Sequence, residues 1–336
     1  MSLTEGPVKE LDDKFVDLIG KFVSDIKTGY LKGSNNVALA MVTLLETIIS
    51  DSQNATAFEL CGAVRAAGRR VISALPHELV AANVARRMLR AIRDENRAHA
   101  NQSVEASGES LQRLVLAAGA RRATLGSAQQ DLREPLRDQI AELRGELESS
   151  ISSICGQAKE HVNGDELILT YGSSAIAERF LRAAAHRKYK LIVAEGFISY
   201  LQSHAMANRL SAAGVPVTVI SSASIYAVMS RVNKVVISVK AAMGGGAVLA
   251  ETGLHAVTQA ARHYCVPVLA LAPLYKLSPV HDVSHFNAYA APYTALPYDR
   301  GRILIQFFFY NFSGGSSPSY MYRMLSELYD LNDYVF

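Results

Sequence analysis

The sequence predicts an α/β protein with an N-terminal helical domain, residues 1–160, followed by a doubly wound parallel-sheet domain, residues 161–336. Three observations support this fold class. The chain has 336 residues, which is longer than one domain usually is. Apolar residues in the first half recur at helical spacing. Short apolar runs in the second half alternate with stretches of helical length, which is typical of a parallel sheet covered by helices.

Amphipathic helices account for the first half of the chain. In residues 9–26 apolar side chains recur at steps of three and four, which forms one stripe of a helix. Asn35 or Asn36 can cap the next helix. Thr56 and Glu59 have the spacing of a capping box, which predicts the start of a third helix.

Three further features complete the helical half. Pro76 suits the first turn of a fourth helix. Residues 100–110 are rich in Ser, Glu and Gly, which favours a loop. A long helix begins near Pro135, and its apolar stripe continues to about residue 158. This helix is therefore expected to link the two domains.

Five apolar runs in the second half predict buried strands. They are residues 166–170, 190–194, 216–220, 234–238 and 267–271. Intervening stretches such as 175–187 and 247–263 have the length and period of helices. Ligands of doubly wound sheets bind outside the carboxyl ends of the strands, so we expect any site among the residues that follow the runs.

Two strand ends carry candidate site residues. Gly172 follows the first run and lies in a turn that resembles a nucleophile elbow only loosely, because Ala175 stands where that motif has glycine. The alternative is an ordinary strand-to-helix turn capped by a serine. Lys240 follows the fourth run and is either a phosphate-binding cation or a solvated lysine.

A triple glycine, Gly244, Gly245 and Gly246, comes shortly after Lys240. Backbone amides of such a segment ahead of a helix can hold a phosphate. The segment matches neither the dinucleotide-binding pattern nor the Walker pattern, so a flexible turn is the competing interpretation. Together with Gly172 and Lys240 these glycines form the candidate pocket.

Composition excludes several classes of protein. Lys plus Arg number 34 and Asp plus Glu 31, a net charge of +3 that does not suggest dedicated DNA binding. The three cysteines lie far apart, which fits a reducing compartment. The acidic N-terminus does not resemble a signal peptide, and no apolar run is long enough to span a bilayer. His281 and His285 are a possible metal pair without a third ligand, so we predict neither a metal nor a cofactor.

The C-terminal region is unusually aromatic. Residues 303–312 read ILIQFFFYNF, and a helix that begins near Pro318 carries several tyrosines. Such residues suit a buried core or a subunit interface. Phe307, Phe309 and Tyr320 are therefore candidates for partner contacts.

Several segments resemble a known family. They are ASIYAVMSRVNKVVIS at residues 223–238, APLYKLSP at 272–279, SPSYMYRMLSELY at 317–329 and ANVARRMLRAIRDE at 82–95. These segments are similar to the family of the alpha, beta and delta subunits of eukaryotic translation initiation factor 2B and of sugar-phosphate isomerases. AVMSRVNKV together with KLSP is typical of the beta type.

The resemblance implies a helical domain followed by a Rossmann-like α/β domain, without catalysis. The isomerases of the family carry a cysteine after the first strand and an aspartate after the fourth, where this chain has Gly172 and Lys240. Their phosphate-holding loop contains arginine, which residues 195–202 (EGFISYLQ) lack. An isomerase that acts on a ribose-1-phosphate type of sugar is the alternative, and a phosphosugar or nucleotide sensor is compatible with the leading hypothesis.

The resemblance also implies a role and partners. The chain would be a regulatory subunit of the cytosolic guanine-nucleotide exchange complex, paired most directly with delta and assembled with alpha, gamma and epsilon. The helical domain would contact initiation factor 2 through its alpha subunit and sense its phosphorylation. Arg86, Arg90 and Arg93 share a helical face and are the candidate contact residues, with a merely solvated basic face as the alternative.

Overall fold

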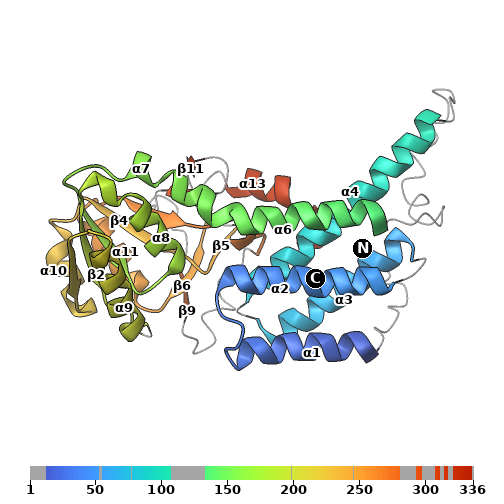
Figure 1. The fold of residues 1–336 in the computed structure, drawn as a ribbon, viewed down its shortest axis with the longest axis horizontal. Helices are drawn as coiled ribbons and strands as arrows, with labels where there is room; N and C mark the ends of the chain where they lie inside the picture. Colours follow the sequence, from blue (N-terminus) through green and yellow to red (C-terminus); the bar gives the residue numbers. More distant parts are fainter. Residues whose placement is uncertain are drawn as a thin grey trace. The chain divides into compact units, whose positions relative to one another are not determined.

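The computed structural model describes most of the chain. The described residues are 13–52, 55–76, 78–106, 133–197, 199–244, 246–280, 293–296, 307–310, 314–316 and 321–334. Figure 1 shows their helices and strands. The predicted fold class is confirmed, because helices make up the N-terminal region and a largely parallel sheet with helices follows it.

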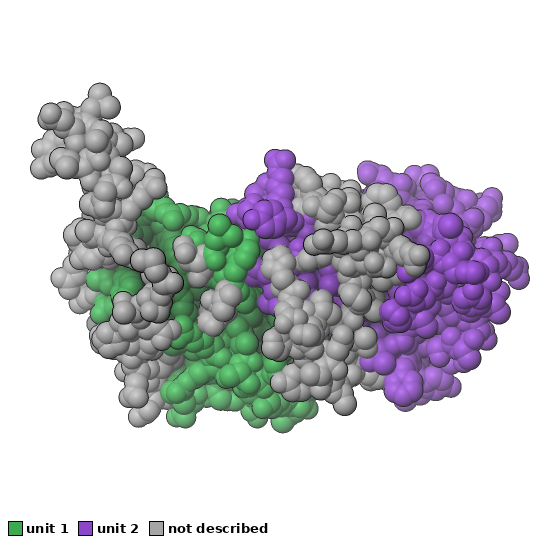
Figure 2. Space-filling model, turned by 180° about the vertical axis from the view of Figure 1, so that it is seen from behind, with its two compact units in different colours: residues 1–147, 328–336 green, residues 148–327 purple. Residues whose placement is uncertain are grey.

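The chain divides into two compact units, which Figure 2 shows in different colours. Unit 1 contains residues 1–147 and 328–336, and unit 2 contains residues 148–327. This division differs from the expected boundary at residue 160 in two ways. It falls inside the long linking helix, and it assigns the last nine residues to the helical unit rather than to the α/β unit.

Unit 1 is built from helices that pack around an apolar core. They are α1 (Asp13–Lys27), α2 (Ser34–Asp51), α3 (Ala57–Ala74), α4 (Leu79–Ala106) and the first part of α6 (Arg133–Gly156). Helix α4 packs against α2 and α3, and α1 packs against the same two helices. Fully buried Met41, Leu45, Ile48, Leu60 and Met88 lie between them.

The helix starts test the sequence interpretation. The capping box is confirmed, because the Thr56 side chain accepts from the Glu59 backbone N–H and the Glu59 carboxylate accepts from the Thr56 backbone N–H. The expected asparagine cap of α2 is wrong, since the N-cap is Gly33 and makes no side-chain hydrogen bond. Pro76 lies before α4 rather than in its first turn, because the helix begins at Leu79.

The larger sheet of unit 2 has seven strands in the order β11-β10-β7-β4-β1-β2-β3. The first four in the chain are β1 (Leu167–Tyr171), β2 (Lys190–Ala194), β3 (Val217–Ile220) and β4 (Lys234–Ser238). They are followed by β7 (Val268–Leu271), β10 (Phe307–Tyr310) and β11 (Gly314–Ser316). All neighbours pair in parallel except β10 and β11. The five predicted strands are therefore confirmed, although β3 lies at the edge of the sheet and is not buried.

Helices pack against this sheet. They are α7 (Ala158–His161), α8 (Ala175–Ala183), α9 (Tyr200–Ala212), α10 (Ile225–Met229) and α11 (Leu254–His263), and α13 (Met321–Leu328) ends the unit. Phe180, Leu181, Met206 and Leu210 from two of these helices join strand residues such as Val193 in one buried cluster. This packing holds the carboxyl ends of the strands in place.

A second, smaller sheet was not expected from the sequence. It has the order β8-β5-β6-β9 and consists of β5 (Ala241–Met243), β6 (Val248–Glu251), β8 (Leu277–Ser278) and β9 (Tyr293–Leu296). The expectation of a helix over residues 247–263 is wrong for its first part. Strand β6 occupies that part, and α11 begins only at Leu254. This sheet brings Glu251, at the end of β6, to the edge of the larger sheet.

Candidate functional site

The carboxyl ends of β1 and β2 carry a hydrogen-bonded polar site in unit 2. Gly172 follows β1, and its backbone N–H donates to the carbonyl of Ala194 at the end of β2 (2.9 Å). The described residues of the loop after β2 are 195–197 and Ser199, which precedes α9. Glu251 from the small sheet reaches this loop, so segments far apart in the chain meet here.

The carboxylate of Glu251 is held by Ser199. The Ser199 hydroxyl donates to Glu251 Oε1 at 2.7 Å, and the Ser199 backbone N–H donates to the same oxygen at 3.2 Å. Ser199 is the N-cap of α9, where the positive end of the helix dipole favours a negative group. The carboxylate thus takes the position at which a helix N-terminus commonly holds an anion.

Two glycines make room for this carboxylate. A Cβ at Gly172 would lie 2.5 Å from Glu251 Oε2, and a Cβ at Gly196 would lie 2.5 Å from Glu251 Oε1. The backbone of Gly172 also has a φ of +68°, a conformation that residues with a Cβ rarely adopt. Glycine at position 172 is therefore required by space and by backbone conformation.

Tyr171, the last residue of β1, forms hydrogen bonds to two neighbouring loops. Its hydroxyl donates to the carbonyl of Thr252 (2.7 Å) and accepts from the backbone N–H of Phe197 (3.3 Å). The side chain is buried, and burial raises the pKa of the phenol above its ordinary value. The Ser203 hydroxyl in turn accepts from the backbone N–H of Gly196. The loop is held from several sides.

An apolar cluster on this fixed loop was missed by the sequence analysis. Phe197 is 79% exposed and Leu201 is 73% exposed, and Tyr200 beside them is half exposed. The Tyr200 ring lies 4.9 Å from that of His204, and His204 Nε2 lies 2.7 Å from a Glu195 carboxylate oxygen. The available signal was the segment EGFISYLQ, which places large apolar residues where a strand end usually carries polar ones.

Lys240 follows β4 as expected and is half-buried. Its backbone N–H donates to the carbonyl of Leu249, a residue of β6. This hydrogen bond lies directly before the pairing of β5 with β6. A second lysine was missed. Lys276 is 4% exposed, and its ammonium group donates to the carbonyl of Val239 at 2.7 Å. It fastens the segment after β7 to the end of β4.

The glycine segment does not lie ahead of a helix. Gly244 and Gly246 form the turn between strands β5 and β6, and the backbone N–H of Gly246 donates to the carbonyl of Met243. Gly245 lies outside the described residues. Because Gly246 precedes β6 and Glu251 ends it, the turn and Gly172 lie at opposite ends of that strand. The structure therefore does not gather these glycines and Gly172 into one pocket.

The three candidate arginines of α4, Arg86, Arg90 and Arg93, do not form a shared exposed face. Arg86 is 3% exposed, and its guanidinium donates to the backbone carbonyls of Asp333 and Tyr334 and to the side-chain oxygen of Asn83. Burial lowers the pKa of Arg86 to about 10. Its expected role as a surface contact is corrected, because this side chain lies inside unit 1.

Arg93 lies against the same C-terminal segment. It is bonded to both carboxylate oxygens of the fully buried Asp333, and it also pairs with Asp330 at 3.4 Å. Burial disfavours its charge, but the hydrogen bond and the attraction of Asp333 outweigh burial and raise the pKa of Arg93. Arg65 from α3 also donates to Asp333 (2.8 Å). We call Arg65, Arg86, Arg93 and Asp333 the carboxylate cluster.

Arg90 is the member of the predicted set that stays near solvent. Its guanidinium pairs with Asp94 one turn along α4 at 3.2 Å, and about a third of its side chain is exposed. Sequence analysis could not separate it from Arg86 and Arg93, because their partners lie some 240 residues later in the chain. A partner-binding role for Arg90 stays a prediction.

The aromatic candidates of the C-terminal region are described only in part. Phe307 and Phe309 belong to β10, which pairs with β7 on one side and β11 on the other. Their strand is thus an inner strand of the sheet. Tyr320 lies outside the described residues. In the following helix and its end, Tyr322 is exposed, whereas Tyr329 is buried.

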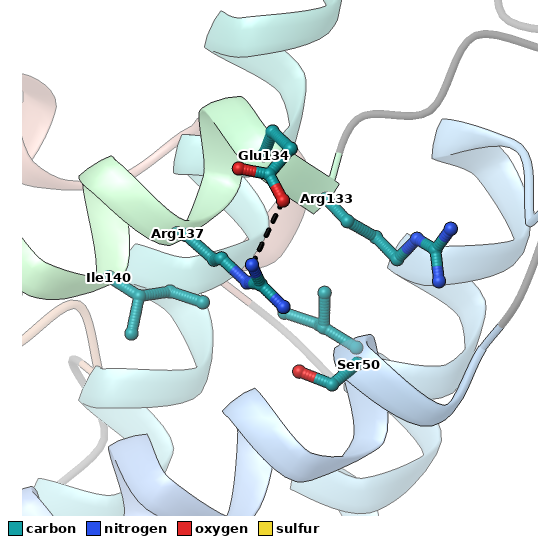
Figure 3. A pocket seen from close by; sticks show the side chains of 6 residues that line it. Ser50, Arg133, Glu134, Arg137 and Ile140 are labelled. Atoms are coloured by element: carbon teal, nitrogen blue, oxygen red, sulfur yellow. Dashed lines mark hydrogen bonds and ion pairs between the residues drawn. The ribbon is translucent and has the colours of Figure 1, made fainter.

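A separate pocket of about 220 Å³ lies in unit 1, between the end of α2 and the start of α6 (Figure 3). It is lined by Ile49, Ser50, Arg133, Glu134, Arg137 and Ile140. Arg137 points to Glu134 and donates to its carboxylate at 2.9 Å. The pair is exposed, and the pocket includes none of the residues expected from the sequence. It combines charges of both signs and offers no set of groups for catalysis.

The described residues lack two kinds of feature. They contain no group of three or more His, Cys, Asp or Glu side chains arranged to hold a metal ion. His281 and His285 lie outside the described residues. None of the described helices combines the length and the apolar character needed to cross a membrane.

Comparison with known proteins identifies the family. The model of the initiation factor 2 subunit family matches residues 30–306. The beta subunit of translation initiation factor eIF2B from Schizosaccharomyces pombe is 31% identical over 381 aligned residues, which cover 94% of this chain and 97% of the relative.

Two solved structures agree with this match. The crystal structure of eIF2B beta from Chaetomium thermophilum is 26% identical, with a TM-score of 0.75 and 98% of each chain covered. A chain of the tetrameric eIF2B-beta2-delta2 complex from C. thermophilum is 25% identical, also with a TM-score of 0.75, and the match covers 96% of this chain and all of that one. The chain therefore belongs to the initiation factor 2 subunit family.

Proposed function

We propose that this chain is a non-catalytic regulatory subunit, of the beta type, in a translation initiation factor 2B complex that exchanges guanine nucleotides. The observation that carries the proposal is the match to beta subunits over nearly the whole length of both chains. The match in three dimensions covers both the helical and the α/β region, so the whole architecture supports it. The setting would be the cytosol.

The isomerase alternative is not favoured. A thiol nucleophile at position 172 would require a Cβ that lies 2.5 Å from the Glu251 carboxylate oxygen. Lys240 lies two residues beyond the end of β4 and offers a cation where an acid–base carboxylate would be needed. The strand ends that would carry the reaction thus lack both groups.

The proposed partners are other subunits of the complex, delta most directly and alpha, gamma and epsilon in the assembly. The beta2-delta2 structure of the C. thermophilum relatives supports the choice of delta. We assign Phe197, Tyr200 and Leu201 to the assembly surface, because large apolar side chains that are fixed and exposed together usually mark an interface.

Contact with initiation factor 2 through its alpha subunit is the finer part of the proposal. Arg69 and Arg70 near the end of α3 are exposed, and Arg90 is partly exposed. Basic side chains of this kind can respond to a phosphoserine, which adds about −1.5 to −2 charge. The proposal does not use Arg86, which is buried, or Arg93, which is bonded to Asp333.

Pairing is tested by co-expressing the chain with the delta-type subunit of its own organism. Phe197→Asp with Leu201→Asp is expected to reduce the co-purified delta chain, because two desolvated charges would oppose the contact. Phe58→Asp is the matched control, since Phe58 is similarly exposed but belongs to α3 of unit 1. If the wild-type chain does not co-purify with delta, the proposed function is wrong. If the double variant pairs as well as the wild type, the assigned surface is wrong.

A further inference from the structure

The edge of a doubly wound sheet is where this fold receives ligands, and phosphate groups bind there at a helix N-terminus. In this chain, the side chain of Glu251 lies at that place. Its Oε1 accepts from both the backbone N–H and the hydroxyl of Ser199, the N-cap of α9. These two Ser199 donors, which could bind a phosphate oxygen, are therefore already occupied by a carboxylate oxygen.

The surroundings fit this side chain closely. Glu251 Oε2 lies 2.5 Å from the place of a Cβ on Gly172, and Oε1 lies equally near that of Gly196. Tyr171 donates to the carbonyl of Thr252, the residue after Glu251, and so fixes the backbone that carries the carboxylate. The space beside the two glycines, the Ser199 donors and the hydrogen-bonded backbone of Thr252 all favour this position of the two Glu251 carboxylate oxygens.

We propose that Glu251 acts as an internal ligand, which fills the anion position at the carboxyl edge of β1 and β2 and closes it to phosphate-bearing sugars and nucleotides. Its carboxylate excludes such ligands in two ways. It occupies the volume between the two glycines, and its negative charge repels a phosphate that approaches the same donors. The inference goes beyond the proposed regulatory function, and it does not depend on pairing with other subunits.

The first test measures binding of inorganic phosphate by the full chain, through thermal unfolding at constant ionic strength with chloride as the reference salt. The wild type is expected to show no phosphate-specific rise in Tm. Glu251→Ala should show a rise that saturates with phosphate concentration, because it frees the Ser199 donors and the space beside Gly172. Adding Ser199→Ala to that variant should reduce the rise, because the hydroxyl donor is lost and only the backbone N–H remains.

Glu195→Ala is the matched control. Glu195 is another carboxylate near this site, directly after β2, and its side chain contacts His204 rather than Ser199. It should leave the response to phosphate as in the wild type. Should Glu251→Ala not fold, Glu251→Ser carries the same test, because its small polar side chain also vacates the position. Saturable phosphate binding by the wild type, or an equal response in Glu251→Ala and Glu195→Ala, would overturn the proposal.

A second measurement tests, without any added ligand, whether the Glu251 carboxylate fills the anion position. Gly172→Ala should lower the Tm of the wild type more than it lowers the Tm of Glu251→Ala, because the added Cβ meets the carboxylate only in the wild type. The strain of the positive φ is common to both backgrounds and cancels. Equal losses of Tm in the two backgrounds would show that the carboxylate does not fill the position.

Discussion

Asp333 is fully buried in unit 1 and receives hydrogen bonds from Arg65 and Arg93. Asp333→Asn would remove the carboxylate that pairs with Arg65 and with Arg93, and Arg93 would keep only its longer pair with Asp330. Breaking a buried ion pair from one side costs about 3–5 kcal/mol. We expect a loss of this size in the free energy of unfolding of unit 1, measured by urea denaturation.

Asp94→Asn provides the control for this substitution. Asp94 pairs with Arg90 and Arg97 on the surface of the same helix, and its side chain is half exposed. Exposed pairs contribute between about 0 and 1 kcal/mol. If both variants lost the same small amount, the carboxylate cluster would not stabilise the fold.

Cys61 lies beside the carboxylate cluster and is predicted to stay protonated. Burial raises the pKa of its thiol from 9.0 to about 11, although Arg93 and Arg65 partly offset this effect. Because the thiolate is the reactive form, Cys61 should resist alkylation at pH 8 in the folded chain, whereas the exposed Cys265 should react readily. Peptide mapping by mass spectrometry after a timed reaction measures both sites. Rapid labelling of Cys61 under native conditions would contradict the burial of its thiol.

The same thiol makes stability depend on pH at the alkaline end. The pKa of the Cys61 thiol is higher in the folded chain than in the unfolded chain. The contribution of the buried thiol to the free energy of unfolding is therefore complete below about pH 9 and is lost as the pH rises toward 11. Two pKa units correspond to about 3 kcal/mol. Cys61→Ala should therefore lose less stability than the wild type between pH 9 and pH 11, which urea titrations at each pH would measure.

At the scale of one element, the start of α3 gives a direct test. Thr56→Ala removes the side-chain acceptor of the capping box and should lower the free energy of unfolding by about 1 kcal/mol. Thr47→Ala is the control, because its hydroxyl bonds within α2 to the carbonyl of Thr43 and caps nothing. Chemical denaturation of both variants measures the difference, and an equal loss in the two would exclude a special role for the cap.

The elements of this protein differ in how far the sequence predicts them. Strands β1, β2 and β4 were expected within one residue, because each is a short run that is apolar on both faces. Strand β6 was interpreted as part of a helix, since a short apolar run fits either period. Asn35 and Asn36 follow a sound preference, but Gly33 takes the cap position instead.

At the scale of the whole molecule, the C-terminal segment from Leu328 to Phe336 belongs to the helical unit. Ending the chain after Glu327 would remove the buried Tyr329 and Asp333 and expose their partners in unit 1. We expect a larger loss of stability than Asp333→Asn causes, with rapid proteolysis of α3 and α4. The fragments of unit 2 should persist in the same digest and serve as the internal control. Equal resistance of the truncated and complete chains would contradict this assignment.

The sequence by itself determined the fold class, the five parallel strands that it predicted and the family, because these depend on local periodicity and on continuous segments. It also named Gly172 as a candidate site residue at a strand end. Tertiary structure alone decided the partners of the polar groups. Glu251 meets Ser199, and Arg86 meets the C-terminal segment, across more than 50 and more than 240 residues of chain. A hydrogen bond or ion pair depends on distances in space, and spacing along the chain does not record distances of that kind.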